Sequence, residues 1–176
     1  ILGWSGLSTS GSENIVVNNL YVYNSGNDHC HSAIHLDGGG KVYLNCTIDG
    51  CVGNGVMIDS VFSPFSNAVV KVNAKNCMRG VALVGGDKSM PTNILIKDSK
   101  VSFNDVGVMV SNARNAFIDS CEITENKEYG VLFQGRFGGC DSMLTDTFVD
   151  KNGINIDEIH ESKNNFIISD AWEGPK

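Results

Sequence analysis

The sequence predicts an all-β fold, a single-stranded right-handed parallel β-helix of about six coils of 22–27 residues. Three observations predict it. A short unit recurs at a near-constant period, the apolar residues inside each unit alternate with period two, and turn-forming residues separate the alternating runs. Together they indicate a solenoid in which every coil consists of three short strands.

The repeated unit is a small residue followed by an aliphatic residue, any residue and a second aliphatic residue. The units are Ala33–Leu36, Gly55–Ile58, Gly80–Leu83, Gly107–Val110, Gly130–Phe133 and Gly153–Ile156. Their small residues lie 22, 25, 27, 23 and 23 positions apart. The alternation within each unit is that of a strand with one buried face. No segment has helical spacing of apolar residues over three turns, and the Leu-x-x-Leu-x-Leu frame of leucine-rich repeats is absent.

Two further strands complete each coil. A second alternating run occurs in 41–44, 94–96 and 116–118, and a shorter third run follows in 46–48, 100–102 and 121–123. Stacking such coils about 4.8 Å apart buries one continuous column of Val, Ile and Leu. The predicted organisation is a lead-in segment 1–13, a β-helix 14–172 and a tail 173–176.

The corners of the coils are rich in Asn, Asp, Gly and Ser, which favour left-handed backbone conformations and side-chain-to-backbone hydrogen bonds. Asn24, Asn76, Asn104 and Asn126 fall at similar places after the third strand. They form either a stacked ladder along the axis or a set of solvated turn residues. Both interpretations are structural.

Composition and charge exclude some functions. The net charge of −7 argues against a nucleic acid partner. No apolar run approaches the roughly 18 residues of a membrane span, so we expect no membrane insertion.

The six cysteines include no paired C-x-x-C motif, and several lie in apolar strand patterns. We expect mostly free, buried thiols, which favours folding in a reducing cytosol over secretion.

The Gly-Val-x-Ile units, the Asn-rich corners and the segment Asn45–Gly50 resemble the right-handed β-helix of the pectate-lyase-like superfamily. That superfamily includes polysaccharide lyases, polygalacturonase-type glycosidases, alginate epimerases and the tailspikes of bacterial viruses. The resemblance covers about residues 14–172 and specifies the fold better than the chemistry. The motifs Asn-Thr-Asp, Gly-Asp-Asp, Gly-His-Gly and Asp-Pro-His-Asp are absent, which leaves tailspikes and tail fibres as the most similar group.

The alternation predicts which strand residues point outward. The first outward column is His35, Met57, Ala82, Met109, Leu132 and Asn155; the second is Asp37, Asp59, Val84, Ser111, Gln134 and Asp157. Asp37 and Asp59 would lie on neighbouring coils beside His35, where like charges raise one another's pKa and suit a carboxylate pair to glycoside cleavage. We predict Asp37, Asp59 and His35 as catalytic residues. The alternative is that both carboxylates cap turn amides.

The middle of the first column is apolar. An outward stripe of Met57, Ala82, Met109 and Leu132 should be covered by something, because large exposed apolar patches are uncommon. The tailspike resemblance implies a homotrimer contact as one cover, a loop folded back over the sheet is an equal alternative, and the apolar faces of sugar rings would also serve.

Four more residues are candidate substrate contacts. Arg114 and Arg136 would bind carboxylate or sulfate groups, Phe62 would stack on sugars, and Gln134 belongs to the second outward column. Phe62 has the alternative of packing against the sheet. The segment 28–31 with His35 lacks a second ligand group, so no metal or other cofactor is predicted, although a lyase would call for Ca²⁺.

Three functions follow from these observations. The first is a tailspike-like glycan depolymerase or receptor-binding fragment that folds in a host cytoplasm, resides in a virion tail and has a cell-surface polysaccharide as its partner. The second is a secreted polysaccharide-lyase-like enzyme. The third is a non-catalytic structural or adhesive solenoid in which Asp37 and Asp59 are only turn residues.

Overall fold

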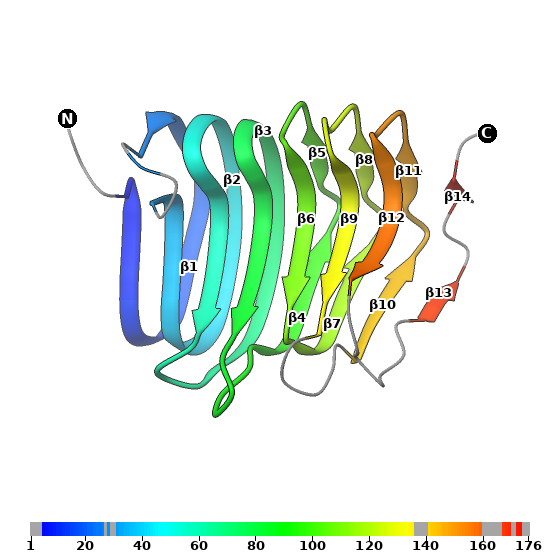
Figure 1. Ribbon diagram of the computed structural model, residues 1–176. Coiled ribbons are helices and arrows are strands. Elements are labelled where there is room, and N and C mark those ends of the chain that lie inside the picture. Colours follow the sequence, from blue (N-terminus) through cyan, green and yellow to red (C-terminus); the bar gives the residue numbers. More distant parts are fainter. Residues whose placement is uncertain are drawn as a thin grey trace.

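A computed structural model of the chain describes residues 5–26, 28, 31–135, 141–159, 167–169 and 172–173. Over these residues the regular structure is entirely β-strand (Figure 1). The strands are β1 (Leu7–Ser25), β2 (Ser32–Ser60), β3 (Phe65–Gly85), β4 (Thr92–Lys97), β5 (Lys100–Ser102), β6 (Val106–Ser111), β7 (Arg114–Asp119), β8 (Glu122–Thr124), β9 (Tyr129–Gln134), β10 (Asp141–Thr145), β11 (Phe148–Asp150), β12 (Ile154–Ile159), β13 (Ile167–Ser169) and β14 (Trp172–Glu173). Within the described ranges, no helix is long and apolar enough to cross a membrane.

The chain winds into a parallel β-helix with three sides, which we call sheets A, B and C. The long strands β1, β2 and β3 each pass through corners and contribute to more than one side. Sheet A consists of 7–10, 32–37, 54–60, 79–85, β6, β9 and β12; sheet B of 15–17, 42–44, 68–70, β4, β7, β10 and β13; sheet C of 20–23, 46–49, 72–75, β5, β8, β11 and β14. All the strand pairs are parallel, and the predicted fold class is confirmed.

The core is a column of aliphatic side chains stacked rung on rung. In sheet A, Val56 pairs with Val81, Val81 with Val108 and Val108 with Val131, and all four are fully buried. Sheet B adds a similar inner row that includes Val70, Ile96 and Ile118. Because every coil buries the same few positions, the alternation seen in the sequence is a direct image of the core.

The structure corrects the predicted equivalence of the corner asparagines. Asn24 and Asn76 have positive φ and sit one place before the inner corner position, in line with Phe103. Asn104 and Asn126 are buried at the inner position, and Asn152 continues their row. The two sets therefore occupy adjacent columns. The repeat spacing in the sequence cannot distinguish these columns, because the lengths of the corners differ by one residue from coil to coil.

The inner corner column contains a true amide ladder. The Asn126 Oδ1 atom accepts hydrogen bonds from the backbone N and the Nδ2 atom of Asn104 at 3.1 and 3.0 Å. The Asn152 Oδ1 atom does the same for Asn126 at 2.9 and 2.8 Å. In the preceding coils this column is Ser25, Cys51 and Cys77, and the Cys77 backbone N donates to the Asn104 Oδ1 atom at 3.0 Å.

The first rung and the register of the last coil differ from the sequence-based expectation. Residues 7–13, which the sequence analysis placed in the lead-in segment, belong to β1 and pair with β2, for example Leu7 with Ile34. Their alternation is hard to detect because this rung is rich in Ser and Gly. In the last coil Asp157, not Asn155, pairs with Leu132, so both outward columns end two residues later than predicted.

The cysteines behave as predicted where they are described. Cys46, Cys51, Cys77 and Cys121 are free and buried, whereas Cys30 and Cys140 lie outside the described residues. Burial raises the pKa of the Cys46 thiol to about 12, so this group stays protonated at neutral pH.

Candidate functional site: the concave side of sheet A

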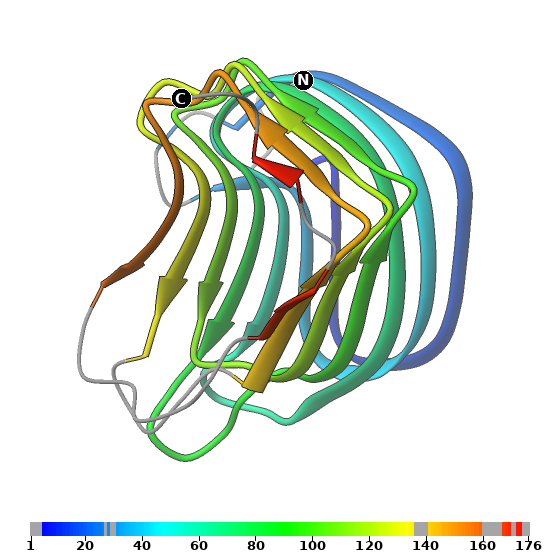
Figure 2. The ribbon, with the colours of Figure 1, turned by 90° about the vertical axis from the view of Figure 1, so that its right-hand side faces the viewer.

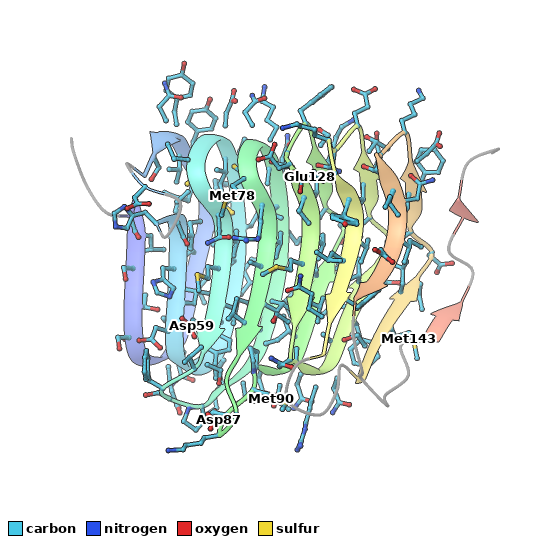
Figure 3. All side chains as sticks on the ribbon, viewed as in Figure 1. Asp59, Met78, Asp87, Met90, Glu128 and Met143 are labelled. Carbon is cyan, nitrogen blue, oxygen red and sulfur yellow. The ribbon has the colours of Figure 1, made fainter. Side chains whose placement is uncertain are left out.

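Sheet A is bent so that its outer side is concave. Viewed along the axis, its strands curve inward at the left of the molecule (Figure 2). Asp59 lies toward the end of these strands and Glu128 where they begin (Figure 3). Side chains on a concave side approach one another, so this surface can enclose a ligand or pack against itself.

From the rung of Ala82 onward the concave side packs against itself. Ala82, Met109 and Leu132 are at most 8% exposed and form a second hydrophobic cluster, separate from the core, with Val106. Tyr129 packs against the same cluster. The predicted outward column agrees with the pairing of Ala82, Met109 and Leu132, and the cover that this stripe was expected to need comes from the packing of these side chains on one another. The curvature brings these side chains together, so that they cover one another within one chain.

In the earlier coils the same columns contain the polar residues His35, Asp37 and Asp59 beside Met57. The His35 Nε2 atom lies 3.6 Å from the Asp59 Oδ2 atom, an ion-pair distance slightly longer than a hydrogen bond. The side chain of Asp59 is 13% exposed and that of His35 30%. The structure therefore brings together two of the three predicted catalytic residues.

The second oxygen of Asp59 has a different partner. The Asp59 Oδ1 atom accepts a hydrogen bond from the backbone N of Val61 at 2.7 Å, the turn-capping contact that the structural interpretation anticipated. One oxygen thus fixes the turn after the strand, and the other faces His35. The carboxylate is held in a single orientation by both.

The charge state of Asp59 differs from the predicted one. Burial of its carboxyl acts to raise the pKa, but the contact with His35 and the amides of Val61 and Ser60 outweigh burial and lower it. We had expected a neighbouring carboxylate to raise it. The favourable partners dominate, so Asp59 is ionised at neutral pH.

Asp37 lies on the rung before that of Asp59. Its Oδ2 atom accepts a hydrogen bond from the Ser10 hydroxyl at 3.3 Å, and Ser10 is its partner on the first rung. The buried Oδ1 atom has no hydrogen-bond partner among the described residues. A buried carboxylate oxygen without a partner is unusual in a folded protein and marks a place where a ligand group or water can bind.

The loop after Asp59 is anchored rather than free. The fully buried Ser60 hydroxyl lies 2.9 Å from the Ser89 hydroxyl and accepts a hydrogen bond from the backbone N of Phe65 at 3.2 Å. Phe62, at the tip of this loop, is 87% exposed. The alternative that Phe62 packs against the sheet is wrong, and its ring is accessible beside the Asp59 turn.

A second polar group on the concave side was missed by the sequence analysis. The Arg79 Nη1 atom donates a hydrogen bond to the Asn54 Oδ1 atom at 3.2 Å, and the Asn54 Nδ2 atom donates to the Ser32 hydroxyl at 3.2 Å. Met57 lies next to this chain, its sulfur 3.5 Å from both the Asn54 Nδ2 and Ser32 Oγ atoms. The sequence does contain a signal for this group. The residue just before the small residue of the repeat is polar in three successive units, as Ser32, Asn54 and Arg79.

The remaining predicted contacts are more distant. Gln134 shares the second outward column with Asp59, but Val84 and Ser111 occupy the rungs between them. Arg114 is exposed at the turn into β7, where its backbone N donates to Pro91. Arg136 lies outside the described residues. In the described part of the chain, no group of three or more His, Cys, Asp or Glu side chains could hold a metal ion.

Sheet B carries an open groove of about 690 Å³ that the sequence analysis did not single out. The middle residue of each second strand points outward there, and these residues are apolar: Val16, Tyr43, Val69, Leu95 and Phe117. Beside them, the Asn115 Nδ2 atom donates to Asn93 and the Asn93 Nδ2 atom to Asn67.

Comparison with known proteins agrees with this architecture. The family described as "Right handed beta helix region" matches residues 5–172. The chain belongs to this family. No curated protein and no solved structure matches it. Membership of the right-handed β-helix family defines the scaffold and is compatible with both carbohydrate-active and structural roles.

Proposed function

We propose that this right-handed β-helix binds a polysaccharide on the concave side of sheet A and cleaves it at the His35–Asp59 pair. The observation that carries the proposal is the 3.6 Å approach of His35 to a carboxylate held ionised in a concave surface. Perturbed titratable groups that converge in a concavity are typical of active sites.

The roles follow from the environments of the three side chains. Asp59, ionised and fixed by Val61, is the base or nucleophile, and His35 orients it. Asp37, with an unpaired buried oxygen, is the proton donor. In hydrolysis its proton goes to the glycosidic oxygen of the leaving sugar, while water adds to the anomeric carbon and gives a proton to the carboxylate opposite.

The buried free cysteines support folding in a reducing cytosol, which fits a tailspike-like depolymerase or receptor-binding fragment in a virion tail better than a secreted enzyme. A lyase is the alternative on the same residues, because an ionised carboxylate can also remove a proton from a uronate ring. Phe62 offers a stacking surface for a sugar ring next to the Asp59 turn.

The test is depolymerisation of a panel of bacterial surface polysaccharides, followed by chain length and by new reducing ends. Asp59→Asn keeps the shape and the hydrogen bond from Val61, and it should lower the rate by at least about 100-fold. His35→Gln should lower it by a smaller factor. Products that absorb in the ultraviolet would identify a lyase.

The matched control is Asp146→Asn, because Asp146 is exposed at the distant corner between sheets B and C. Its activity should equal that of the unaltered protein. If Asp59→Asn cleaves as fast as this control, the catalytic assignment fails. If no polysaccharide in the panel is bound or cleaved, the protein is a structural solenoid.

A further inference from the structure

Arg79 is a cation whose guanidinium is not in ion-pair contact with any described carboxylate. It is half-buried on the concave side, and its guanidinium donates a hydrogen bond to Asn54 and is attracted by the charge of Glu128. No described Asp or Glu lies within 4.0 Å of its guanidinium. A guanidinium has five N–H donors, so most of its donors are available to a ligand.

Several described lysines, in contrast, form ion pairs with carboxylates. Lys71, Lys75 and Lys100 each lie within 3.1 Å of an acidic oxygen on a neighbouring rung. In an acidic chain of net charge −7, carboxylates are abundant, yet no described one, Glu128 included, forms an ion pair within 4.0 Å of Arg79. Partial burial of a charge without a counter-ion in contact is costly, and an anion supplied from outside would offset that cost.

The guanidinium is held in place by its neighbours. Asn54 and Ser32 are at most 4% exposed, and their mutual hydrogen bond leaves the Asn54 Oδ1 atom facing Arg79. On the next rungs the paired positions are Val106 and then Tyr129, which are apolar or aromatic. Arg79 therefore sits at the boundary between the polar and apolar halves of the concave side, where one charged group of a bound chain would be recognised.

We propose that Arg79 binds a carboxylate or sulfate group, and that the ligand of the concave side is therefore an acidic polysaccharide. The choice of ligand rests on the proposed function, whereas the anion site does not. Guanidinium matches both oxyanions through two parallel hydrogen bonds, a geometry that lysine cannot reproduce. Arg79 is a specificity-determining residue in this scheme and takes no part in bond cleavage.

The anion site is tested by nitrogen NMR of the arginine side chains in the full chain. Sodium glucuronate and sodium sulfate are the probes, methyl glucoside is the neutral control, and Arg79→Lys assigns the Arg79 Nε resonance. Arg79 should shift in a saturable way with both anions and not with methyl glucoside. The exposed Arg114 should shift weakly and without saturation. An Arg79 resonance that does not move, or moves as Arg114 does, overturns the proposal.

Specificity is tested with acidic polysaccharides and their carboxyl-reduced or desulfated counterparts. The unaltered protein should retain the acidic member of a bound pair at least about tenfold more strongly, and Arg79→Gln should remove that preference. Arg79→Lys should recover part of it. Anion binding without any polysaccharide binding would reject the proposed function alone. Polysaccharide cleavage that ignores charge and Arg79 would reject this inference alone.

Discussion

The earlier coils of the β-helix, residues 7–85, and the later coils, residues 92–159, share one backbone repeat and differ in what that repeat carries. On the concave side the earlier coils present His35, Asp59 and Arg79, whereas the later coils present a buried cluster that includes Met109 and Leu132. A single scaffold thus has one half whose outer side chains bury one another and one half that presents polar side chains, among them the buried Asp37 Oδ1 atom without a partner in the described part of the chain.

The inner corner column also differs between the earlier and the later coils. In the later coils Asn104 and Asn126 form a hydrogen-bonded ladder, and in the earlier coils the column holds Cys51 and Cys77. Amides that bond both along the axis and to the turn backbone fix the corner, while buried thiols pack with weak hydrogen bonds. We infer that the later coils are the more stable half and that the candidate site lies on the less reinforced half.

The largest expected effect tests the concave cluster. Leu132→Ala should lower the free energy of unfolding by about 2–5 kcal/mol, because Leu132 is 4% exposed and its removal leaves a cavity. Met57→Ala, in the same outward column but half-buried, should cost only about 1 kcal/mol. Urea unfolding at 25 °C measures both. Equal losses would remove the distinction between the two halves.

An intermediate effect tests the corner column. Asn126→Ala should cost about 2–3 kcal/mol, because it leaves the Asn104 backbone N and the Val101 carbonyl without their partner. Hydrogen exchange at the Asn104 amide should accelerate in this variant. Cys51→Ala should cost at most about 1 kcal/mol, because the Cys51 Sγ atom is 4.0 Å from its closest acceptor, the His31 carbonyl. If Cys51→Ala were the more damaging change, the ladder would not be the reinforcing element.

The smallest effect tests the polar half. The folded-state pKa of Asp59 is lowered, so its stabilising contribution is present above its ordinary value of 3.8 and is lost as pH falls through the folded pKa. For a pair that is partly exposed we expect a contribution on the order of 0.5 kcal/mol. The stability difference between the unaltered protein and Asp59→Asn should shrink below pH 3.8 in urea unfolding. A difference that grows on acidification would contradict an ionised Asp59.

Prediction from the sequence succeeded where the period of two dominates. The units from Ala33–Leu36 to Gly130–Phe133 gave the correct inner row, and placing His35 and Asp59 on the outer side followed from the same alternation. It failed at Gly153, where a small residue and two aliphatic residues imitate the repeat in a corner that is two residues longer. It also passed over Arg79, because the residue before the small position does not follow the alternation of the strand.

The sequence by itself determined the fold class, the inward and outward faces of the central strands and the burial of the described cysteines, because these depend on local periodicity and apolar content. The tertiary structure decided the curvature of sheet A, which turned an apparently exposed stripe into a buried cluster. It also decided the charge state of Asp59 and the position of Arg79 beside Asn54 with no carboxylate in contact. Those properties depend on which side chains are in contact across neighbouring coils. A shift of one or two residues at a corner changes the register and therefore all of these contacts.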